Sequence, residues 1–150
     1  MADPFLTAAI EQAKIGLSTK GGIPIGSVLV VDGDIIARGY NKRVQEGNPI
    51  LHAEMDCLAN AGRLQSSQYG RATLYSTLSP CDMCSGAVLL YKIPRIVIGE
   101  NRTFRGPEEY LRARGVLLEV ADSEECYRLM QDFIARFPSL WNEDIGQPDK

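Results

Sequence analysis

The sequence predicts a three-layer α/β/α fold, in which a five-stranded mixed sheet is flanked by helices. Segments rich in β-branched residues alternate along the chain with segments whose apolar residues recur every three or four positions. With 150 residues, the chain fits one domain and can bury about two thirds of its unfolded surface. We therefore expect residues 1–150 to form a single domain.

The first third of the chain is predicted to form a helix followed by a β-hairpin. Apolar residues recur at helical spacing over residues 5–17, and Gly21-Gly22 ends this helix. Strands over 25–31 and 35–38 flank Asp32-Gly33, a pair that tolerates positive φ at both turn positions. The two strands should therefore pair antiparallel.

The rest of the chain alternates helices with strands. Residues 39–49 are interpreted as a polar loop, and a Ser/Gln/Gly linker follows residue 62. The predicted elements are helix 52–62, strand 72–76, helix 81–91, strand 95–98, helix 108–114, strand 116–120 and helix 123–137. This alternation implies that the later strands are parallel and joined by right-handed crossovers.

Composition and charge favour a protein that acts on a small substrate in the cytoplasm. The net charge is −3 and no Lys/Arg cluster is present, whereas a protein that binds nucleic acid usually has a basic surplus. The chain has neither a secretory leader pattern nor an apolar run of membrane-spanning length. In a reducing compartment we expect Cys57 and Cys126 to be small core residues and not disulfide partners.

A metal site is indicated by Cys81 and Cys84, which are three apart and so share one face of a helical turn. The only histidine of the chain, His52, is the candidate third ligand. Both predicted helix starts provide unpaired N–H groups, which lower the pKa of a nearby thiol. Three protein ligands and one open position are typical of a catalytic zinc site.

Glu54 follows His52 by two residues, so the two side chains can serve one pocket only at the mouth of a helix. A carboxylate beside the metal could accept a proton from the attacking water, pass it to a ring nitrogen and then protonate a departing amine. The spacing His-x-Glu followed by Pro-Cys-x-x-Cys is the signature of zinc deaminases that act on nucleobases.

Three simpler interpretations remain for these residues. Cys81 and Cys84 could belong to a structural zinc site, but such a site needs a fourth ligand. They could form a redox pair, which would leave His52 and Glu54 without a role. A histidine or a glutamate at a helix start can also be a simple capping or dipole residue. The residues favour the catalytic reading only when taken together.

Beyond these residues, the chain resembles the cytidine deaminase superfamily, and within it the small fungal-type cytosine deaminases that act on the free base. The resemblance covers nearly the whole chain. The stretches that carry it are Gly21-Gly22-Ile23-Pro24-Ile25-Gly26, Gly39-Tyr40-Asn41, Thr77-Leu78-Ser79-Pro80-Cys81-Asp82-Met83-Cys84, Ile93-Pro94-Arg95, Val97-Ile98-Gly99-Glu100-Asn101 and Trp141-Asn142-Glu143-Asp144-Ile145-Gly146.

The resemblance implies a role for each residue of the site. One Zn²⁺ per chain would bind His52, Cys81 and Cys84, with Glu54 as the proton shuttle. The substrate-binding residues would be the Asn41 side-chain amide, the backbone N–H groups of Ala53 and Cys81, Ser79 and Asp144 at the amine, and Phe104, Trp141 and Ile25 as apolar walls. The resemblance alone implies a homodimer. Taken singly, Asn41 would be interpreted as a turn residue, Asp144 as a solvated charge and the aromatic residues as core.

The expected reaction is the hydrolysis of cytosine to uracil and ammonia, a step of pyrimidine salvage. In the resembling family, the tail at residues 141–146 leaves no room for a ribose. Ala53 stands where the fungal type has glycine, so deamination of guanine, isocytosine or a triazine stays open. A tRNA adenosine deaminase would need basic residues for phosphate contacts. A zinc protein without catalytic activity is the fourth reading.

Overall fold

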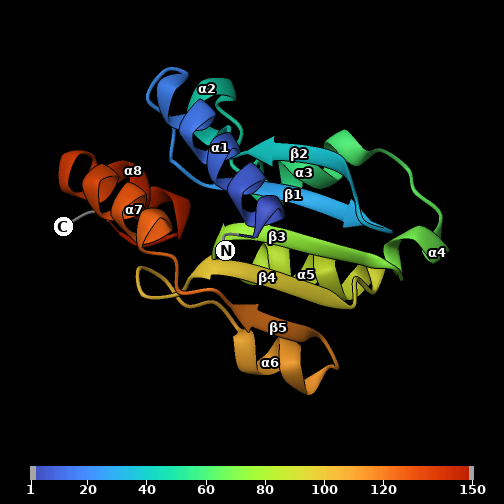
Figure 1. The fold of residues 1–150 in the computed structure, drawn as a ribbon. Coiled ribbons are helices and arrows are strands. Elements are labelled where there is room, and N and C mark those ends of the chain that lie inside the picture. The colour runs from blue at the N-terminus through green and yellow to red at the C-terminus, as the bar shows by residue number, and fades with distance from the viewer. Residues whose placement is uncertain (1–2, 149–150) are drawn as a thin grey trace.

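A computed structural model describes residues 3–148 and shows a five-stranded mixed sheet flanked by helices (Figure 1). The strands are β1 Gly26–Val31, β2 Asp34–Tyr40, β3 Ala72–Leu78, β4 Arg95–Glu100 and β5 Leu117–Val120. The helices are α1 Pro4–Ser18, α2 Arg43–Glu46, α3 Ala53–Ala61, α4 Ser66–Tyr69, α5 Asp82–Tyr91, α6 Glu108–Ala113, α7 Glu124–Arg136 and α8 Pro138–Asp144. The predicted fold class is confirmed. Within residues 3–148, none of the helices has the length and apolar character needed to cross a bilayer.

The strand order is β2-β1-β3-β4-β5. Strand β1 pairs antiparallel with both β2 and β3, whereas the β3/β4 and β4/β5 pairs are parallel. The predicted hairpin and the predicted parallel crossovers are both confirmed. Asp32 and Gly33 have φ values of 51° and 85°, as a tight turn of this kind requires.

Two apolar cores lie on opposite faces of the sheet. Side chains alternate between the faces of a strand, so Leu29 packs toward α3 and α5 while its neighbour Val28 packs toward α1 (Figure 1). A third apolar cluster lies at one end of the sheet and joins Ala53 of α3, Leu78 of β3 and Trp141 of α8. This cluster is where the ends of the elements converge on the candidate site.

Three short helices were not predicted, and several boundaries differ by one or two residues. Helices α2 and α4 have four residues each, too few for an apolar period to be visible. Helix α8 follows α7 after a break at Phe137 and begins with Pro138. Proline at the first helical position is a recognisable start signal. The sequence prediction treated this segment as a tail and did not use that signal.

Candidate metal centre

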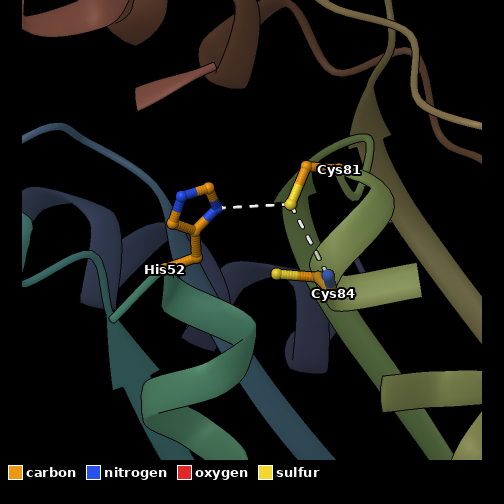
Figure 2. Close-up of side chains that lie close together, drawn as sticks. All are labelled: His52, Cys81 and Cys84. Carbon is orange, nitrogen blue, oxygen red and sulfur yellow. Dashed lines mark hydrogen bonds between the residues drawn. The ribbon is translucent and has the colours of Figure 1, made fainter. Parts of the chain in front are cut away.

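His52, Cys81 and Cys84 come together although 29 residues separate the first two (Figure 2). Their candidate ligand atoms all lie within 4.8 Å of one another. His52 Nδ1 is 3.4 Å from Cys81 Sγ, and the Cys84 backbone N–H donates to the same sulfur at 3.5 Å. The structure thus assembles the three ligands that the spacing indicated.

Two helix N-termini converge on this centre. His52 is the N-cap residue of α3, and Cys81 is the N-cap residue of α5, both with extended backbone. An N-cap side chain bends back over the helix end, so each ligand lies beside N–H groups that carry partial positive charge. One turn into α5, Cys84 is fully buried and faces the same point.

The donor set fits a zinc ion. The hydrogen bond from the Cys84 thiol lowers the pKa of Cys81 to about 4; burial opposes this shift and His52 adds to it. The same hydrogen bond and burial raise the pKa of Cys84 well above its ordinary value. One sulfur is therefore already a thiolate. Thiolate sulfur and imidazole nitrogen are ligands that zinc prefers, and three of them leave one position open.

The imidazole of His52 is held on its second side by a carboxylate. Its Nε2 lies 3.5 Å from Asp144 Oδ1, an arrangement that orients a ligand ring. Burial disfavours the charged imidazole, but the hydrogen bond with Cys81 and the charge of Asp144 prevail and raise the pKa of His52 to about 9. Burial also raises the pKa of Asp144, while His52 and Asn41 act in the opposite direction.

Glu54 lines the same pocket as His52 because one is in the first turn of α3 and the other caps it. This placement at the mouth of the helix explains how two residues only two positions apart can face one pocket. Glu54 is 4% exposed, and burial, with the charge of Cys81, raises its pKa to about 7. A carboxyl with a pKa near neutrality can both accept and donate a proton in one reaction cycle.

The pocket beside these residues is small and mostly apolar. Its polar lining residues are His52, Glu54, Ser79, Cys81 and Asp144, and its apolar ones are Ile25, Leu78, Phe104, Trp141 and Ile145. The enclosed space among them is about 10 Å³, room for about one water molecule. The rings of Phe104 and Trp141 meet edge to face, with centroids 6.1 Å apart.

Helix α8 forms one wall of the pocket and is bound to the first third of the chain. Asn41 Nδ2 donates to Asp144 Oδ1 at 2.8 Å, and both side chains are buried. Arg43 lies 3.8 Å from the same oxygen and 3.2 Å from Glu143. These contacts close the pocket with residues about a hundred positions away in the sequence.

Some of the expected substrate-binding residues line the pocket and others do not. Ile25, Ser79, Phe104, Trp141 and Asp144 all line the pocket. Asn41 lies behind Asp144 and does not line it; its Oδ1 accepts the backbone N–H of Arg43, so its amide is already bonded on both sides. Ala53 is buried in the first turn of α3.

Sequence reasoning missed Leu78, Arg43 and Ile145. Leu78 and Ile145 line the pocket from within stretches that had been singled out for their neighbours. For Arg43 no spacing or composition signal exists, because its contact is made across the fold.

Comparisons with known proteins agree with this geometry. Residues 2–100 match the family described as the cytidine and deoxycytidylate deaminase zinc-binding region. A cytosine deaminase of Candida albicans (strain SC5314 / ATCC MYA-2876) is 48% identical over 143 residues, 95% of either chain. A tRNA-specific adenosine deaminase of Bacillus subtilis (strain 168) is 45% identical over 96 residues, 63% of this chain and 59% of that protein.

Solved structures share the fold. One, from work on tRNA:A34 deaminases, has a TM-score of 0.68 at 26% identity over 84% of this chain and 98% of that one. The guanine deaminase of Nitrosomonas europaea has a TM-score of 0.71 over 90% and 86% of the two chains, and its 23% identity shows a common fold alone.

Proposed function

This chain belongs to the cytidine and deoxycytidylate deaminase family with its zinc-binding region, and on that basis we propose that it hydrolyses free cytosine to uracil and ammonia. The assignment of cytosine as the substrate rests on the 48% identity to a cytosine deaminase over 95% of both chains. The small enclosed pocket, walled on one side by α8, supports a free base over a nucleoside.

The residues divide the chemistry among them. Zinc held by His52, Cys81 and Cys84 would supply a water activated as the nucleophile. In the proposed reaction, Glu54 accepts a proton from that water and delivers it to the ring nitrogen beside the amine-bearing carbon, which makes this carbon more electrophilic. The C–O bond then forms at this carbon. Glu54 takes the proton of the newly attached hydroxyl and delivers it to the amine, the C–N bond breaks, and ammonia leaves as the carbonyl forms.

The substrate is held by groups that match its edges. Asp144 and Ser79 accept hydrogen bonds from the exocyclic amine, and both line the pocket. The backbone N–H groups of Ala53 and Cys81 are assigned to the ring carbonyl and the developing tetrahedral centre. Asn41 acts through Asp144, to which it donates. Phe104, Trp141 and Ile25 pack against the ring faces.

The test is ammonia release by the zinc-loaded protein from cytosine, cytidine, guanine, isocytosine and adenosine in parallel. We expect turnover of cytosine and none of cytidine, because the enclosed pocket walled by α8 is small. Turnover of guanine or isocytosine alone would keep the mechanism and replace the substrate. Turnover of cytidine at a rate similar to that of cytosine would contradict the role given to α8.

A tRNA adenosine deaminase is the second candidate, since a Bacillus subtilis enzyme of that name is 45% identical over part of the chain. The net charge of −3 disfavours it, because contacts to phosphates need lysine and arginine. Filter binding to tRNA at moderate salt separates the candidates. Strong retention of tRNA by the protein would favour the RNA substrate.

We also propose a homodimer formed through the exposed face of α5. Leu90, on this face, is 70% exposed, and a groove beside it is lined by apolar residues of α3 and α5, Leu58 and Ala87 among them. Exposed apolar residues next to an apolar groove are typical of an interface between chains. We expect light scattering after size exclusion to give twice the mass of one chain, and Leu90→Arg to reduce it to one. Leu117→Arg, at a residue 68% exposed on β5, is the matched control and should remain dimeric.

Two further proposals concern the protein as a whole. We propose that residues 1–150 form one deaminase domain, because the apolar cluster at the site joins helices from both ends of the chain. We propose the cytoplasm as its location, since none of its four cysteines, all within residues 3–148, forms a disulfide, as expected in a reducing compartment.

A further inference from the structure

A buried carboxyl group lies behind the wall of the pocket and takes no part in the chemistry above. Glu108, in the first turn of α6, is 1% exposed. Its Oε2 accepts a hydrogen bond from Ser79 Oγ at 2.6 Å. Its Oε1 accepts one from Asn101 Nδ2 at 3.1 Å and lies 3.6 Å from Arg105 Nε. Two donors therefore converge on one carboxylate oxygen, and the hydroxyl of Ser79 on the other.

Ser79 is part of the pocket lining, and its hydroxyl proton is committed to Glu108. The backbone N–H of Gly106 donates to the same hydroxyl oxygen at 3.0 Å. The two segments lie so close that a Cβ on Gly106 would clash with the carbonyl oxygen of Pro80. Because the Ser79 hydroxyl donates its only proton to Glu108, it can only accept a hydrogen bond from a ligand. The backbone carbonyl of Ser79 is likewise an acceptor only.

An acceptor-only wall distinguishes an amine from a carbonyl. The exocyclic amine of the substrate donates hydrogen bonds, whereas the carbonyl that replaces it in the product only accepts them. When two acceptors face each other in a buried site, both stay without a hydrogen-bond donor, and this costs binding free energy. We propose that Glu108 is a positioning residue that fixes the hydrogen-bond polarity of Ser79, so that the pocket retains the substrate amine and releases the product carbonyl. This inference rests on the proposed function.

Glutamine at position 108 should reverse this polarity. Arg105 can only donate, so the side-chain oxygen of Gln would face Asn101 and Arg105 and its NH₂ group would face Ser79. The Ser79 oxygen would then receive hydrogen bonds from two donors, Gln and the Gly106 N–H. Its own proton would have to turn away from Glu108, and Ser79 lines the pocket. The substitution keeps the size of the side chain.

The experiment measures equilibrium binding of cytosine and uracil to zinc-loaded protein that carries Glu54→Gln, so that neither ligand is turned over. Trp141 is the only tryptophan of the chain and lines the pocket, so its fluorescence reports on binding. Adding Glu108→Gln should weaken cytosine and strengthen uracil binding, shifting the ratio of their Kd values by about tenfold toward uracil. A purely structural role would alter both Kd values and leave their ratio unchanged, and that result would overturn the inference.

Two controls make the result specific. Glu109→Gln changes the exposed neighbour of Glu108 and should leave the ratio as it was. In a Ser79→Ala background, Glu108→Gln should no longer move the ratio; a shift that persists without the hydroxyl would disprove the route through Ser79. Ammonia release from cytosine by the wild-type protein is measured beside them. If it fails, the proposed function fails; if it succeeds and the ratio stays constant, only the inference about Glu108 is wrong.

Discussion

Replacing Glu54 by glutamine is expected to lower kcat for cytosine by about 10²–10⁴-fold, the range that a positioned general acid–base group contributes. The carboxyl is buried beside the ligands His52 and Cys81, and its pKa of about 7 suits it to accept and return protons. Glutamine has almost the same shape but cannot exchange a proton. Ammonia release under saturating cytosine is the measurement.

Zinc content and the unfolding midpoint are followed in the same preparations, and both should stay close to those of the wild type. Glu119→Gln is the matched control, because this side chain is 61% exposed and lies on β5. A Glu54→Gln protein that keeps more than about a tenth of the activity would rule out the proton-transfer role, since such a group supplies far more than that.

Cys84→Ala is expected to abolish turnover because the protein loses zinc. Even a residue that only supports a ligand changes metal affinity by about 10–100-fold, so the loss of a ligand should exceed about 100-fold. Cys84 is fully buried in the first turn of α5, and alanine there provides no donor. The measurements are zinc per chain after dialysis and the apparent zinc Kd from competition with a chelator.

A second buried cysteine separates loss of the metal from damage to the core. Cys126 is 1% exposed and packs in the apolar cluster under α1, and burial raises the pKa of its thiol to about 11. Cys126→Ala should therefore cost stability but keep one zinc per chain. Full zinc binding by Cys84→Ala, with unchanged affinity, would remove Cys84 from the ligand set.

The sequence predicted the helices and strands better than it predicted which strands lie side by side. The five strands and the helices α1, α3, α5, α6 and α7 were predicted from their residue patterns, and Asp32-Gly33 identifies the hairpin turn. No local pattern shows that β1 lies between β2 and β3, because the β1/β3 pairing joins Ser27 to Ser76 across β2 and three helices. Helices α2 and α4 are short and are stabilised by their surroundings, which a sequence pattern does not contain.

The site shows the same difference between residues in local motifs and residues whose contacts are made across the fold. The ligands and Glu54 belong to short motifs whose spacing reflects the geometry of a helix start. Arg43 and Glu108 act through contacts with Asp144 and Ser79, which are 101 and 29 residues away, so no spacing rule points to them. The amide of Asn41 was expected to face the ring, but the structure shows it bonded to Asp144 and Arg43.

The hydrogen bond between Asn41 and Asp144 sets an order of events during protein synthesis. Asn41, His52, Cys81 and Cys84 all leave the ribosome well before Asp144, which lies 60 residues after the last of them. A nascent chain that ends after β4 already carries every metal ligand and an open side where α8 will dock. The pocket therefore acquires the wall formed by α8 only after every metal ligand has been synthesised.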